Sequence, residues 1–103
     1  MLVAMLELHV CNADGAMLKA YALGEKEEVL IGREDGCDVQ ISSRAISREH
    51  CVIERTDAGL VLKDLDSSSG TFVDGEKIES IALSSGMEAR VGPAILRFYE
   101  ASL

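Results

Sequence analysis

The sequence predicts an all-β fold, a sandwich of two mostly antiparallel sheets with about 10–11 short strands and binding loops at one end. Short apolar or alternating segments are separated by turn residues about every 8 to 12 positions, which is typical of sandwiches and barrels. Heptads, a long helical stripe and internal repeats are not found. The 103 residues, 48% of them hydrophobic, suit one domain covering residues 1–103.

The N-terminal part of the chain predicts a β-hairpin followed by a third strand. Apolar side chains occupy every second position of residues 2–10, which predicts a strand with one buried face. These side chains are Leu2, Ala4, Leu6, Leu8 and Val10. Residues 12–15, with the sequence Asn-Ala-Asp-Gly, have the composition of a hairpin turn. Residues 17–23 would form the return strand, and residues 28–31 the next one.

The middle and end of the chain predict loops alternating with short strands. Residues 32–48 are rich in Gly, Asp, Ser and Arg, which indicates loops that carry function, around one brief strand at 39–41. The remaining strands are predicted at 50–54, 60–65, 71–73, 88–91 and 95–99. No helix is expected.

Composition argues against several classes of protein. The net charge of −8 disfavours nucleic acid as a partner, because duplex affinity comes mainly from Lys and Arg. The longest apolar stretch, residues 1–5, is too short for a membrane span or the core of a signal peptide, so no membrane association is expected. A cytoplasmic location is the default expectation.

The cysteines and histidines do not predict a metal site or a cofactor. Cys11, Cys37 and Cys51 are widely spaced, and His9 and His50 are not placed to complete a zinc site. We expect the cysteines to be small buried side chains in a reducing compartment. An enzyme is not expected either, because no G-x-S-x-G, phosphate-binding P-loop or H-E-x-x-H motif occurs.

Three polar segments stand between predicted strands, at residues 32–33, 47–50 and 66–71. Loops of a sandwich gather at its ends, so the three segments can converge on one rim. Together they would offer guanidinium groups, hydroxyls and glycine-rich backbone, which are the donors that a phosphate dianion needs. Taken from chemistry alone, a phosphate site and a set of ordinary polar turns both remain open.

These segments resemble the motifs of the forkhead-associated (FHA) domain family. The resemblance rests on I-G-R at 31–33, S-R-E-H-C-V-I at 47–53 and L-x-D-L-D-S-x-S-G-T-F-V-D-G at 62–75. The motif core spans about residues 30–75, and three motifs in this order and spacing are specific together. The resemblance implies an eleven-stranded sandwich that recognises phosphothreonine in a partner protein or peptide, downstream of a Ser/Thr kinase.

The resemblance also implies roles for individual residues. Arg33 would be the principal phosphate ligand, with Ser47, Arg48 and Ser68 as further contacts. The supporting residues would be Gly32, His50, Gly70 and Thr71, with His50 structural and Gly70 in a turn conformation closed to most side chains. Arg44 would lie near peptide residues beyond the phosphothreonine.

Position 69 departs from the family pattern. Family members usually have Asn there, which bonds the main chain of the bound peptide, whereas this chain has Ser69. Serine is shorter and has one hydroxyl in place of separate amide donor and acceptor groups. A phosphate-independent interaction or self-association module on the same fold is therefore the alternative function.

Overall fold

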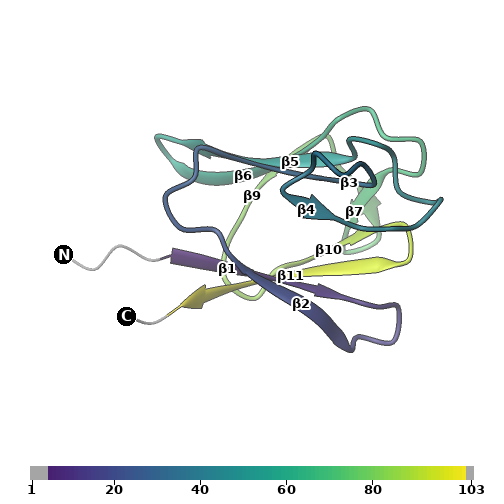
Figure 1. Cartoon of the computed structure of the whole chain (residues 1–103). Helices are drawn as coiled ribbons and strands as arrows, with labels where there is room; N and C mark the ends of the chain where they lie inside the picture. Colours follow the sequence, from purple (N-terminus) through teal and green to yellow (C-terminus); the bar gives the residue numbers. More distant parts are fainter. Residues whose placement is uncertain (1–4, 102–103) are drawn as a thin grey trace.

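The computed structural model describes residues 5–101, which form eleven strands in two sheets and contain no helix (Figure 1). The six-stranded sheet has the order β2-β1-β11-β10-β7-β8. Its strands are β1 (Met5–Cys11), β2 (Met17–Ala22), β7 (Thr71–Val73), β8 (Glu76–Lys77), β10 (Glu88–Val91) and β11 (Ala94–Ala101). The five-stranded sheet has the order β4-β3-β5-β6-β9. Its strands are β3 (Glu28–Gly32), β4 (Val39–Gln40), β5 (Cys51–Thr56), β6 (Gly59–Asp64) and β9 (Ser80–Ala82).

The predicted fold class is confirmed, since nearly all strand pairs are antiparallel. The exception is the pair of β3 and β4, which run parallel. The alternating pattern predicted for the first strand places Leu8 and Val10 in the core, while Leu6 packs against it. Leu2 and Ala4 lie outside the described residues. In the described part of the chain no helix exists that could cross a membrane.

The core lies between the two sheets and is filled from both. Its largest fully buried side chains from the six-stranded sheet are Leu8, Leu96 and Phe98, and those from the five-stranded sheet are Ile31, Ile53 and Leu62. The three cysteines are buried free thiols, as expected. Burial raises the pKa of the Cys51 thiol to about 12, so at neutral pH this thiol is protonated and unreactive.

Two short strands were not predicted from the sequence. The segments that form β8 and β9 contain two and three residues, and their burial patterns are dominated by exposed positions. A period of two cannot be recognised over so few residues. Both strands lie on edges of their sheets, where β8 extends β7 and β9 extends β6.

The sandwich has two different ends. The start of β1 and the end of β11 lie on the left of Figure 1, whereas the loops joining β3 to β4, β4 to β5 and β6 to β7 lie at the right. The turn between β10 and β11 lies at this same right-hand end. The fold therefore presents the three polar segments together, remote from the ends of the described chain.

Candidate functional site

Hydrogen bonds join the three polar loops into one rim. The backbone N–H of Arg33 donates to the carbonyl oxygen of Ser47 at 3.0 Å, and the N–H of Ser68 donates to Oγ of Ser47 at 3.0 Å. The hydroxyl of Ser69 donates to the carbonyl oxygen of Ala45 at 2.7 Å. Ser47 is thus the point where the loops after β3 and after β6 meet the loop between β4 and β5.

Two guanidinium groups belong to this rim. Nε of Arg33 donates to the carbonyl oxygen of Ile46 at 3.0 Å, which anchors the base of an otherwise exposed side chain. Within the described residues, no protein group accepts a hydrogen bond from its terminal nitrogens. Arg48 is exposed as well, and its backbone carbonyl accepts from the N–H of Glu34 at 3.2 Å. Both residues keep donors for a ligand while their backbones are fixed by the neighbouring loop.

The close approach of two loops explains why residue 32 is glycine. A methyl group at position 32 would lie 2.1 Å from the carbonyl oxygen of Arg48 and 2.9 Å from Sγ of Cys37. Such contacts are far inside van der Waals separation, so any side chain would push the Arg33 and Arg48 loops apart. Gly32 therefore supports the site because, without a side chain, it allows the two loops to approach each other closely.

His50 lies completely buried beneath the rim and joins two of its loops. Its Nδ1 accepts a hydrogen bond from the backbone N–H of Ser47 at 3.1 Å. Since Nδ1 must carry the lone pair, Nε2 carries the proton and donates to the carbonyl oxygen of Gly70 at 2.9 Å. Both ring nitrogens are therefore engaged with backbone groups, and the residue ties the segment at Ser47 to the segment at Gly70.

A half-buried carboxylate organises the loop between β6 and β7. Asp64 accepts hydrogen bonds from Oγ of Ser67 at 2.6 Å, from the N–H of Ser67 at 3.1 Å and from Oγ1 of Thr71 at 2.7 Å. Oγ of Ser67 in turn accepts from the N–H of Gly70, whose φ of 87° favours glycine. This network shapes the segment that presents Ser68 and Ser69.

The ionised form of Asp64 is the one that the loop requires. Burial alone raises the pKa of this carboxyl, but the hydrogen bonds from Ser67 and Thr71 outweigh burial and hold the pKa below its usual value. Asp64 and Ser67 were not among the predicted site residues. Asp64 lies three residues before Ser67, which lies three residues before Gly70. This spacing is typical of side chains that cap a turn, and it was the signal in the sequence that could have identified both residues.

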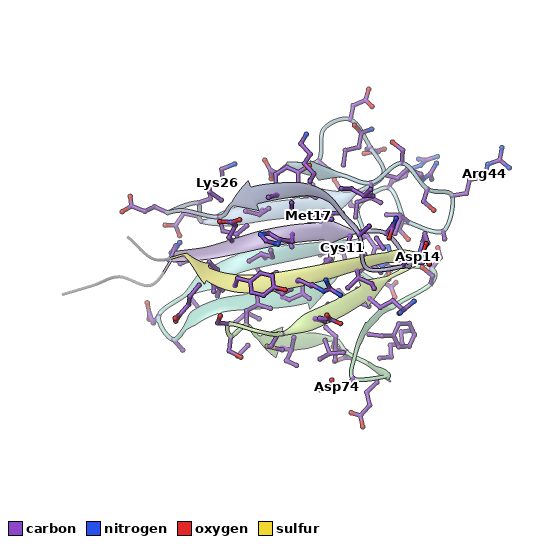
Figure 2. All side chains as sticks on the ribbon, turned by 90° about the horizontal axis from the view of Figure 1, so that it is seen from below. Cys11, Asp14, Met17, Lys26, Arg44 and Asp74 are labelled. Carbon is purple, nitrogen blue, oxygen red and sulfur yellow. The ribbon has the colours of Figure 1, made fainter. Side chains whose placement is uncertain are left out.

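Of the remaining predicted residues, Arg44 is the one least connected to the rim. Figure 2 shows its side chain extended away from the body of the molecule. Ser69 is in the rim, but its hydroxyl proton is directed to Ala45 within the protein. Its oxygen retains acceptor capacity for a ligand N–H.

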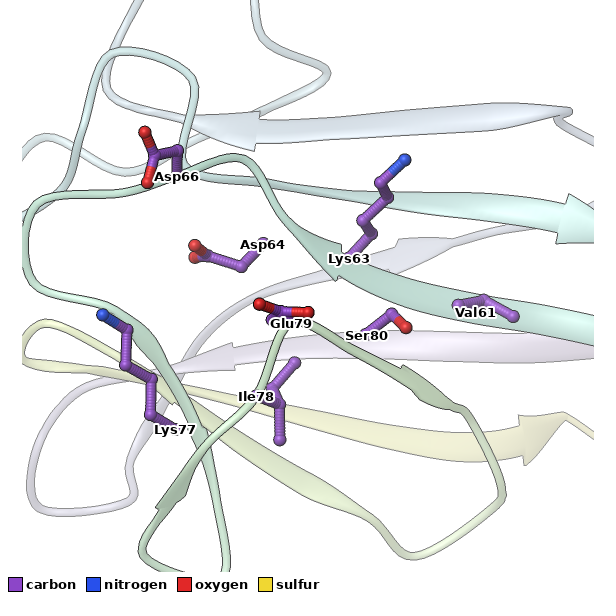
Figure 3. Close-up of a pocket in the computed structure, with 8 residues that line it drawn as sticks. All are labelled: Val61, Lys63, Asp64, Asp66, Lys77, Ile78, Glu79 and Ser80. Atoms are coloured by element: carbon purple, nitrogen blue, oxygen red, sulfur yellow. The ribbon is translucent and has the colours of Figure 1, made fainter.

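A separate groove lies beside the loop between β6 and β7. It has a volume of about 770 Å³, and Figure 3 shows Lys63 and Lys77 at its sides together with three carboxylates. Those carboxylates belong to Asp64, Asp66 and Glu79. Carboxylates outnumber lysines, and none of the predicted phosphate ligands lines this groove. It is therefore a poorer place for a phosphate than the rim.

The rim combines the donors that suit a phosphate dianion. Arg33 and Arg48 can each offer two parallel N–H bonds to phosphate oxygens, and the hydroxyls of Ser47 and Ser68 are short donors. The described residues contain no group of three or more His, Cys, Asp or Glu side chains arranged to hold a metal ion. The rim side chains are thus hydrogen-bond donors of the kind that suit an anion.

Comparison with known proteins agrees with this geometry. The family model for the FHA domain matches residues 29–92, a range that includes all three loops. The chain is 35% identical over 69 residues to human kinesin-like protein KIF13B, an alignment that covers 67% of this chain and 4% of that protein. It is also 35% identical over 69 residues to the oxoglutarate dehydrogenase inhibitor of Corynebacterium diphtheriae, covering 67% of this chain and 48% of that protein.

A solved structure is similar over nearly the whole chain. It is that of EmbR from Mycobacterium tuberculosis in complex with a low-affinity phosphopeptide, with a TM-score of 0.83 and 31% identity. The similarity covers 97% of this chain and 26% of that one. The chain therefore spans less than half the length of each of these three relatives.

Proposed function

Because the chain belongs to the FHA domain family, we propose that it binds phosphothreonine-containing segments of partner proteins, downstream of a Ser/Thr kinase. The observation that carries this proposal is the meeting of the three polar loops at Ser47. Two exposed arginines belong to the same rim: Arg33 precedes Ser47 in the sequence and Arg48 follows it. The similarity to EmbR, a relative whose structure contains a phosphopeptide, supports it. The proposal treats residues 1–103 as one domain in the cytoplasm, where its buried thiols would stay reduced.

In this proposal each rim residue has a separate task. Arg33 would bind the phosphate through its free terminal nitrogens, and Ser47 would donate its hydroxyl to a phosphate oxygen. Arg48 and Ser68 would add further donors, while Oγ of Ser69 would accept an N–H from the peptide backbone. With a net charge of −8, affinity would depend on these local donors and not on a broad positive surface.

The same geometry argues against catalysis by the Ser side chains of the rim together with His50 beneath them. A general base must reach the proton that it removes. The Nδ1 atom of His50 receives the backbone N–H of Ser47 and not its hydroxyl, and Nε2 is occupied by Gly70. We therefore propose a recognition domain without enzymatic activity.

The test is a titration of the chain with a degenerate phosphothreonine peptide library and with its unphosphorylated counterpart. We expect binding to the phosphorylated library alone. Arg33→Ala should weaken that binding by at least about tenfold, since a charge-assisted hydrogen bond contributes about 1.5–3 kcal/mol. Arg90→Ala is the matched control, because it removes the same charge from an exposed position on β10 outside the rim.

Unchanged affinity in a folded Arg33→Ala protein would contradict the assignment of the site. Binding of a partner that survives phosphatase treatment would instead favour the phosphate-independent module. The observation on the side of that alternative is the bond from Ser69 to Ala45, which commits the hydroxyl proton of this residue within the protein.

A further inference from the structure

A second groove opens beside the rim, between the two sheets. It has a volume of about 460 Å³ and is bounded by the β1–β2 hairpin, by residues 40–43 and by the turn between β10 and β11. Its apolar lining includes Val10, Leu18, Ile41 and Pro93. Lys19 is the one charged residue among the thirteen that line it. Most of the lining is therefore uncharged, and an apolar side chain can be buried against it.

This groove shares a wall with the phosphate-binding rim. Gln40 lines the groove, and its Nε2 donates to the backbone carbonyl oxygen of Arg33 at 3.2 Å. Ser43, another lining residue, accepts a hydrogen bond at Oγ from the N–H of Ala45, and the carbonyl of Ala45 receives Ser69. The groove and the rim are thus adjacent, joined through Gln40 and Ser43.

The groove also lies between two sheet edges with free backbone groups. Strand β2 pairs with β1 alone and β4 with β3 alone among the described residues. Residues of both edge strands line the groove. An extended peptide could therefore hydrogen-bond to either edge while its alternate side chains enter the groove.

One lining residue is unusually exposed for its size. Leu18 is 66% exposed, the largest value among the large hydrophobic residues of the described chain. Its neighbour Met17 is 57% exposed but does not line the groove. Figure 2 places Met17 near Cys11, its register partner in β1. An exposed leucine beside a binding site is well placed to contact a ligand.

We propose that this groove binds apolar side chains of the same partner segment that carries the phosphothreonine, at positions more than three residues from the phosphorylated residue. The inference rests on the proposed function and deepens it. It makes the partner a long extended segment with two features, a phosphothreonine and a distal apolar residue. Recognition of both would be more selective than recognition of the phosphate alone.

The experiment uses a phosphothreonine peptide library with degenerate flanks long enough to extend well past three residues on each side. Peptides retained by the wild-type chain are sequenced. We expect Leu, Ile, Val, Met or Phe to be enriched at a position more than three residues from the phosphothreonine. For one selected peptide, replacing that residue by Ser should weaken binding about tenfold, the effect of losing one buried apolar side chain.

Leu18→Glu should abolish the distal enrichment and weaken the selected peptide by about the same factor. Its affinity for a short phosphothreonine peptide that lacks the distal residue should stay within about twofold of the wild-type affinity. Met17→Glu is the matched control, because it adds the same charge one residue away on the same strand, outside the groove. Thermal unfolding of all three proteins verifies that they are folded.

Several outcomes would overturn the inference. Phosphothreonine-dependent binding without distal enrichment would do so while leaving the proposed function intact, as would equal effects of Leu18→Glu and Met17→Glu. A wild-type dimer that Leu18→Glu dissociates would show that a second copy of the chain occupies the groove. Absence of any phosphothreonine-dependent binding would remove the proposed function and this inference together.

Discussion

The rim and the layer directly beneath it differ in burial although they are built from the same short segments. The rim residues Arg33, Ser47, Arg48, Ser68 and Ser69 are exposed or half-buried. The supporting residues Gly32, His50, Gly70 and Thr71 are all buried. The rim can therefore change with limited effect on folding, whereas the layer beneath determines both the stability of the fold and the positions of the rim donors. Variants in the two regions should separate binding from stability.

Gly32→Ala should have the largest effect on stability. The added methyl group would lie 2.1 Å from the carbonyl oxygen of Arg48, and the backbone must move to admit it. We expect a loss of about 3 kcal/mol or more in the free energy of unfolding, measured by urea denaturation. Gly36→Ala is the control, because its methyl group meets no atom within 4 Å, and it should change stability by less than about 0.5 kcal/mol. Equal effects would show that the loops at Arg33 and Arg48 are not held at close approach.

His50→Leu should have the next largest effect on stability. It leaves the N–H of Ser47 and the carbonyl of Gly70 without their buried partner, which should cost about 2–3 kcal/mol. Phosphopeptide affinity should fall as well, because both loops lose their common anchor. His9→Leu, which removes a half-buried bond to Glu7 on β1, should cost less than about 1 kcal/mol and leave affinity unchanged. If His50→Leu lost phosphopeptide affinity but kept its full stability, His50 would act as a rim residue. The distinction between the rim and the buried layer would then be wrong.

The smallest of the three effects concerns pH and Asp64. Because the folded state lowers the pKa of this carboxyl, its ionised form stabilises the fold above the unfolded-state value of 3.8. That contribution is lost as pH falls through the lower folded-state pKa. We expect Asp64→Asn to be less stable than wild type by about 1 kcal/mol at pH 6. The difference should shrink progressively below about pH 4.

Denaturation of wild type and Asp64→Asn at several pH values measures this effect. Asp57→Asn, an exposed turn position, controls for removal of a negative charge from a chain of net charge −8. A difference between wild type and Asp64→Asn that grows toward low pH would contradict the role of the carboxylate as an acceptor for Ser67 and Thr71.

The sequence predicts the sandwich because burial of one sheet face leaves a period of two, as at Leu6, Leu8 and Val10. It also predicts which residues lie in the rim, since the polar segments fall between strands. It does not predict the contacts that loops make with other segments. The bonds of Gln40 with Arg33 and of Ser69 with Ala45 depend on the separation of segments in space, which no local pattern encodes. For the same reason the groove beside Leu18 could not be predicted, because its walls come from both sheets.

The bond from Nε of Arg33 to the carbonyl of Ile46 has a consequence for the entropy of association. A free arginine side chain loses about 1.5–2 kcal/mol of rotamer entropy when it is immobilised. In this chain the bond to Ile46 already restricts the Arg33 side chain at its Nε atom before any ligand binds. In the proposed complex Arg33 would therefore lose less conformational freedom on binding, and a given set of phosphate contacts would yield a tighter complex.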